Sequence, residues 1–118
     1  MEGRADGGKS MADIANMKHR PDLVRLLNGR DAHAGVVRID RRTRWGNPFR
    51  LGRDGGRAEV IELYRRDLWR RIRAGEIALE DLAALNSATL LCHCRPLRCH
   101  GDVLARAAAW AAGQLGRT

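Results

Sequence analysis

The sequence is poor in aromatic residues, lysine and cysteine, and it has no long hydrophobic stretch. Three Trp, one Tyr and one Phe are its only aromatic residues, so we expect a core of aliphatic side chains and alanine. No apolar run approaches the ~20 residues that span a membrane, and the N-terminal residues lack the apolar segment of a secretory signal peptide. These absences predict a cytoplasmic protein with no membrane partner.

Cysteine is also scarce, because the chain has only three in 118 residues. An odd and small number of cysteines does not fit a disulfide scaffold, and in a reducing compartment we expect thiols or metal ligands. A chain of this length supports one small domain.

Arginine is abundant. Lysine and arginine together number 22 against 14 acidic residues, which gives a net charge of +8, and Lys9 and Lys18 are the only lysines. Guanidinium groups suit phosphate, so a nucleotide or nucleic-acid partner is one interpretation. The other is codon usage, since a GC-rich genome supplies Arg, Ala and Gly whatever the function. The charge alone does not separate the two.

The N-terminal residues carry a formal phosphate-binding motif. Residues 3–10, "GRADGGKS", match the pattern G-x-x-x-x-G-K-S, in which a loop hangs between a strand and a helix. Only two residues precede the match, so no strand can deliver the loop, and we interpret the match as chance. Residues 1–18 are predicted to be a flexible tail, and residues 19–118 a single α/β domain.

Hydrophobic spacing predicts alternating strands and helices in the remaining chain. The clearest pattern places Val60, Ile61, Tyr64 and Leu68 on one stripe of a long helix. The predicted strands cover residues 35–39 and 88–92. A short helix is predicted to begin at Pro21, and three further helices are predicted over residues 57–74, 79–85 and 101–112. A strand, two helices, a strand and a helix in this order predict an α/β fold with a small parallel or mixed sheet and a long crossover helix.

The stretch "LCHCRPLRCHGD", residues 91–102, contains all three cysteines. Strand alternation puts Cys92 and Cys94 on one face and His93 on the other. Pro96 ends the strand, so Cys99 and His100 lie at the start of the last helix, where the helix dipole is expected to lower the pKa of Cys99.

Three interpretations of this cluster compete. The first is zinc, held by Cys94, Cys99 and His100 and possibly Cys92, although the spacing is unusual. The second is a reactive thiolate at Cys99 beside His100. The third is structural, with cysteine as a small buried apolar residue, and we favour it for Cys92 alone.

Two motifs together resemble a known family. "RWGNPF" (residues 44–49) followed by "CHCRPLRCHGDVL" (residues 92–104) resembles the bacterial and phage family catalogued as domain of unknown function 4326. The resemblance covers roughly residues 36–112 and carries no settled activity. It implies that one site contains the following side chains: Arg44, Trp45, Asn47, Cys94, Cys99, His100 and Asp102.

The leading functional hypothesis is a small enzyme-like domain that acts on a nucleotide or nucleic acid. Both motifs follow a strand, and parallel neighbouring strands would bring both loops to the same edge of the sheet. In this hypothesis Arg41, Arg42 and Arg44 hold phosphate. Trp45 stacks on a base or, alternatively, anchors its loop in the core.

Asn47 would orient the ligand, and Cys99, His100 and Asp102 would perform the chemistry. The alternative hypothesis is a zinc-stabilised nucleic-acid-binding module without catalysis, in which the arginines contact the phosphate backbone. A plain interaction protein is the third possibility. The sequence does not reveal the reaction or the oligomeric state.

Overall fold

The structure, a computed structural model, describes residues 12–116 of the chain. These residues form an α/β domain around a four-stranded mixed sheet in the order β1-β4-β3-β2. The strands are β1 (Asp13–Asn16), β2 (Ala32–His33), β3 (Val36–Arg38) and β4 (Thr89–Cys92). The helices are α1 (Pro21–Leu27), α2 (Arg57–Arg73), α3 (Leu79–Ala84) and α4 (His100–Gln114). Short 3-10 turns cover Met17–His19 and Leu85–Ser87.

The predicted crossover is confirmed. β4 pairs in parallel with both β1 and β3, and β2 pairs with β3 in the antiparallel sense. The chain leaves β3, passes through a long loop, α2 and α3, and returns in β4, so the carboxyl ends of β3 and β4 lie at the same edge of the sheet. Both sequence motifs follow these carboxyl ends.

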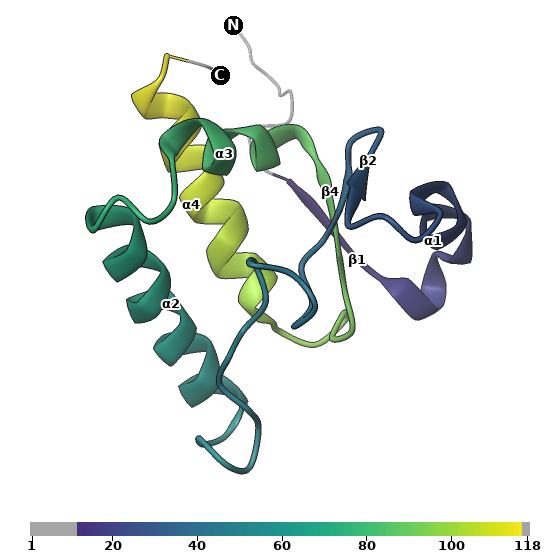
Figure 1. The fold of residues 1–118 in the computed structure, drawn as a ribbon. Helices are drawn as coiled ribbons and strands as arrows, with labels where there is room; N and C mark the ends of the chain where they lie inside the picture. The colour runs from purple at the N-terminus through teal and green to yellow at the C-terminus, as the bar shows by residue number, and fades with distance from the viewer. Residues whose placement is uncertain (1–11, 117–118) are drawn as a thin grey trace, which may run out of the picture.

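Helices cover both faces of the sheet. Figure 1 shows α2, α3 and α4 on one side and α1 on the other. The larger core includes Tyr64, Leu68 and Leu104 from the helices and Leu90 from β4. The smaller core packs Leu27 of α1 against the opposite face of the sheet, which includes the strand residues Val36 and Leu91. Burial of this alternating strand pattern fixes the register of the sheet.

The N-terminal segment is a correction to the sequence prediction. Residues 13–16, assigned to a flexible tail, form β1 at the edge of the sheet and pair with β4 from Asp13↔Thr89 to Asn16↔Cys92. The segment is too short to show a hydrophobic period, and its partner lies far along the chain. The formal phosphate-binding motif of residues 3–10, which we interpret as a chance match, lies outside the described residues.

Candidate functional site

Two close contacts join the motifs at the sheet edge. The amide of Ile39, just after β3, donates to the carbonyl of Leu91 in β4 at 3.0 Å. A Cβ at Gly46 would lie 2.6 Å from the Arg41 Cα, and one at Gly101 would lie 2.9 Å from Ile39 Cδ1. Gly46 therefore leaves no room for a side chain, because the backbone of Asp40 and Arg41 packs directly against it, whereas Gly101 is crowded by the end of the Ile39 side chain.

His100, the first residue of α4, is buried and held in one orientation. Its Nε2 lies 2.6 Å from the carbonyl oxygen of Ile39, and Tyr64 packs edge-on against its ring at 4.9 Å between centroids. A carbonyl oxygen only accepts, so Nε2 carries the proton and Nδ1 has the free lone pair. Burial, helped by Arg41, lowers the pKa of His100, so the ring is neutral near pH 7.

The cysteines differ in exposure and in the pKa of their thiols. Cys92 and Cys99 are 0% and 2% exposed, whereas Cys94 is half-buried. A side-chain hydrogen bond with Cys99 lowers the pKa of Cys92 to about 6, against the effect of burial. The same hydrogen bond, together with burial, raises the pKa of Cys99. The prediction that the helix start lowers the pKa of Cys99 is therefore wrong, because the interaction with Cys92 outweighs the 3.3 Å hydrogen bond from the Gly101 amide.

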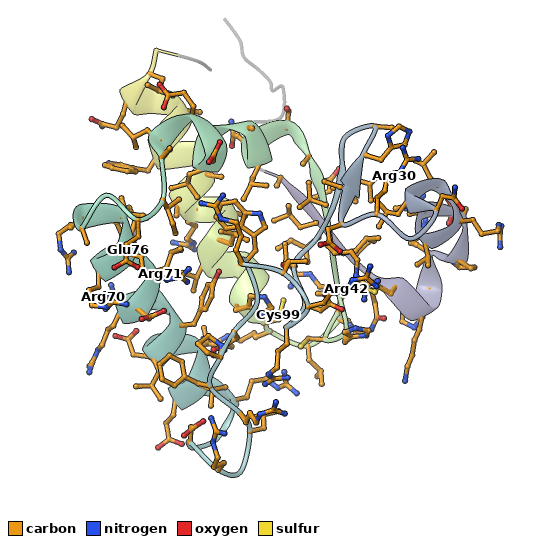
Figure 2. All side chains as sticks on the ribbon, viewed as in Figure 1. Arg30, Arg42, Arg70, Arg71, Glu76 and Cys99 are labelled. Atoms are coloured by element: carbon orange, nitrogen blue, oxygen red, sulfur yellow. The ribbon has the colours of Figure 1, made fainter. Side chains whose placement is uncertain are left out.

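A cavity of about 320 Å³ opens beside these groups, between the long loop, α2 and the start of α4. Figure 2 shows Cys99 at the start of α4, with α2 and the loop around it. We call this space the arginine cavity; its charged, thiol and imidazole groups are Arg41, Arg50, Arg57, Cys94, Cys99 and His100. The structure thus brings the two motifs to one site, as the parallel strands predicted.

The charge in the arginine cavity has one sign. Its lining, drawn from residues 12–116, includes three arginines and no carboxylate. Arg41 and Arg57 donate only to backbone carbonyls, those of Phe49 and Arg98. Arg50 and Arg57 were not predicted as site residues, since nothing in the local sequence pattern separates them from the other arginines.

A second cavity, of about 310 Å³, lies on the other side of the same groups. Cys94, His100, Arg41 and Asn47 line both cavities. Of the three thiols, Cys94 therefore has the widest access to the surface beside His100.

Two predicted phosphate ligands are paired with carboxylates. Arg42 pairs with Asp31 at 3.0 Å and donates to the Gly29 carbonyl. Arg44 pairs with Asp81 at 3.3 Å and lines a different cavity from His100. Both guanidinium groups already have a carboxylate partner. Arg42 lines the second cavity with Cys94 and His100, and Arg41 is the member of the predicted set that lines both cavities.

Trp45 and Asn47 hold the loop in place. Trp45 is 7% exposed in the core and accepts, through its carbonyl, a 2.9 Å hydrogen bond from Tyr64. Its ring is covered by the Arg44 guanidinium at 4.7 Å, which fits the loop-anchor alternative and leaves no open face for a base. Asn47 donates from Nδ2 to the Val60 carbonyl at 3.1 Å and accepts from the Phe49 amide at 2.9 Å, tying the loop to α2.

Asp102 belongs to the helix start. Its Oδ2 accepts from the Cys99 amide at 3.2 Å, and its Oδ1 pairs with Arg95 at 2.7 Å. It faces the groove between α2 and α4, away from the arginine cavity. The buried Asn16 of β1, which sequence analysis missed, donates to the Arg95 carbonyl at 2.7 Å and holds the connection between β4 and α4.

The described residues offer no group of three or more His, Cys, Asp or Glu side chains arranged to hold a metal ion. The zinc set of Cys94, Cys99, His100 and possibly Cys92 thus finds no geometric support within residues 12–116. None of the helices in this part of the chain is long and apolar enough to cross a membrane.

The fold and the site define a small α/β domain with a basic cavity lined by thiols and an imidazole. The chain belongs to the family described as domain of unknown function 4326, which matches residues 24–110. The match begins within α1, ahead of residue 36, where the sequence resemblance was expected to start.

A protein of Enterobacteria phage T4, named as an uncharacterized 12.4 kDa protein in the nrdA-td intergenic region, is 46% identical over 70 residues. The alignment covers 58% of this chain and 63% of the phage protein, so this chain spans less than two thirds of that relative. No solved structure matches the chain.

Proposed function

We propose that the protein is an enzyme-like domain that binds a phosphate-bearing ligand, a nucleotide or a nucleotide unit of a nucleic acid, in the arginine cavity. The observation that carries this proposal is the lining of three arginines without a carboxylate beside Cys94 and His100. Backbone carbonyls hold two of these guanidinium groups, those of Arg41 and Arg57, and guanidinium groups without a carboxylate partner favour a dianionic group such as phosphate.

The rest of the cavity suits the remainder of a nucleotide. Its volume of about 320 Å³ falls in the range of small-ligand sites. Its apolar lining consists of Phe49, Leu51, Val60 and Ile61. A sugar or base packs on such a lining while the arginines hold the phosphate.

Cys94 and His100 are the groups that react in this proposal. His100 Nδ1 accepts the proton of the Cys94 thiol, and the sulfur attacks the phosphorus of the bound ester. An S–P bond forms as the P–O bond to the leaving group breaks, and the leaving oxygen takes the proton from His100. Water then attacks the phosphorus, releases phosphate and restores the thiol.

Calorimetric titration with AMP and with inorganic phosphate tests the binding step. Arg57→Ala removes one cavity arginine and should weaken binding roughly tenfold or more. Arg66→Ala, on the same helix but 71% exposed and paired with Glu62, is the matched control and should bind as the wild type does. Absence of binding to both probes at millimolar concentration would overturn the proposal.

Iodoacetamide labelling tests the reactive thiol. Cys94 should be alkylated before Cys92 and Cys99, and saturating phosphate or AMP should slow its labelling. Cys94→Ser should keep the affinity for AMP and lose hydrolysis of a nucleoside monophosphate. Alkylation of Cys99 ahead of Cys94, measured by peptide mass spectrometry, would contradict the assignment.

A further inference from the structure

A second basic surface adjoins the arginine cavity. The groove between α2 and α4 has a volume of about 580 Å³ and contains four arginines, Arg65, Arg95, Arg98 and Arg106, against two carboxylates. Arg65 and Arg95 pair with those carboxylates, Glu62 and Asp102. Arg98 and Arg106 form no ion pair with any residue that the structure describes, so the groove keeps an excess of positive charge.

The arginine cavity and this helix groove lie next to each other. Ile61 and Cys99 line both, and the Arg57 guanidinium donates to the Arg98 carbonyl at 2.9 Å, at the boundary between them. Along α2, Arg57, Ile61 and Arg65 succeed one another at four-residue intervals, on one face of the helix. Unpaired positive charge thus extends from the arginine cavity to the groove beside it.

We propose that the ligand of the arginine cavity is one nucleotide of a single-stranded nucleic acid, whose backbone continues along the helix groove past Arg98 and Arg106. This inference rests on the proposed function and adds the class of substrate to it. A mononucleotide fills the cavity and leaves the groove arginines without anions, whereas an extended strand supplies a phosphate to each.

Single-stranded rather than duplex nucleic acid follows from the apolar lining of the cavity. Phe49 and the exposed Leu51 line it beside the arginines, and a base packs on these side chains only when it is unstacked and unpaired. A regular duplex keeps its bases inside and presents only its backbone to the groove. The strand therefore binds with one base in the cavity and its phosphates on the arginines.

The test compares fluorescently labelled 12-nucleotide single-stranded DNA and RNA with AMP, by anisotropy and calorimetry, on the full chain. The oligonucleotides should bind at least tenfold tighter than AMP at low salt. Arg98→Ala and Arg106→Ala should each weaken oligonucleotide binding roughly tenfold. Each should also reduce the slope of log K against log salt by about 0.7 and leave AMP affinity unchanged. Arg66→Ala is the control that changes neither ligand.

The outcomes separate this inference from the proposed function. If AMP binds but the oligonucleotides bind no tighter, or if the groove variants change nothing, the strand path is wrong and the cavity assignment stands. Tighter binding of a 12-base-pair duplex than of the single strand would also overturn the inference. If neither AMP nor oligonucleotide binds, both proposals fail.

Discussion

The arginines of the arginine cavity and those along the rest of α2 are the same type of residue in two electrostatic settings. Along α2 beyond the cavity, Arg65 and Arg66 share Glu62 at 2.6 and 3.0 Å, and Arg70 pairs with Asp67 at 2.9 Å. The Arg65 hydrogen bond, with Arg66 beside it, lowers the pKa of Glu62 to about 2. Among residues 12–116, the lining of the arginine cavity includes no carboxylate.

This difference bears on the origin of the net charge. Codon usage supplies arginine without regard to position, and arginines paired at i,i+3 and i,i+4 on a solvated helix face need no other explanation. Like charges around a thiol and an imidazole oppose folding unless an anion compensates them, which is the role of the proposed phosphate ligand. Under that proposal, the two interpretations of the sequence charge apply to different parts of the molecule.

The largest expected effect comes from the loop that holds the cavity wall. Trp45→Ala removes a buried indole from the core and should lower the free energy of unfolding by about 3–5 kcal/mol. Arg44→Ala, its exposed neighbour, should change stability little. Urea denaturation of both variants measures the contrast, and an equal loss would mean that Trp45 is not the anchor.

The next largest effect is the difference in stability loss between replacing a paired arginine and replacing an unpaired one. Arg71 is largely buried and pairs with Asp67 at 3.0 Å, so Arg71→Gln should cost about 1.5–3 kcal/mol. Arg50→Gln relieves repulsion in the arginine cavity and should leave stability unchanged or raised, while phosphate affinity falls. Thermal denaturation with and without phosphate measures both. Equal destabilisation by the two variants would remove the distinction between the regions.

Replacing the thiols should change the free energy of unfolding by a similar or smaller amount. Cys92→Ser places a hydroxyl in the fully buried end of β4 and should cost about 1–3 kcal/mol. Cys94→Ser changes a half-buried side chain at the cavity and should leave stability close to that of the wild type. Chemical denaturation under reducing conditions tests this, and a larger loss for Cys94→Ser would make Cys94 the structural thiol.

The smallest effect is a dependence of stability on pH. Burial lowers the pKa of His100 below its ordinary value of 6.5, so the unfolded chain takes up this proton at a higher pH than the folded chain. This contribution to stability should be complete above about pH 6.5 and decline as the pH falls below it. His100→Gln should flatten the profile between pH 5 and 7, and His33→Gln, on the exposed β2, should not. A wild-type profile without this decline would contradict the neutral buried His100.

Local sequence patterns were sufficient for most elements. The apolar residues of α2 recur with the period of a helix, and the structure gives Arg57–Arg73 where residues 57–74 were expected. β4 ends at Cys92, as the predicted strand over residues 88–92 does, but the strand does not continue to Cys94, on which the placement of Cys92 and Cys94 on one face depended. β1 was missed because its pairing with β4 depends on a segment far along the chain, which no local pattern reveals.

The sequence by itself determined that both motifs follow strands, and parallel pairing then placed them at one edge of the sheet. Only the tertiary structure decided which side chains of those motifs face the cavity. Cys92 and Cys99 form a hydrogen bond with each other in the interior. Asp102 forms an ion pair with Arg95, and Arg42 and Arg44 form ion pairs with carboxylates on other segments. Arg50 and Arg57 enter instead. Charge pairing and burial depend on distances between segments that are remote in the chain, and residue identity and spacing alone do not contain those distances.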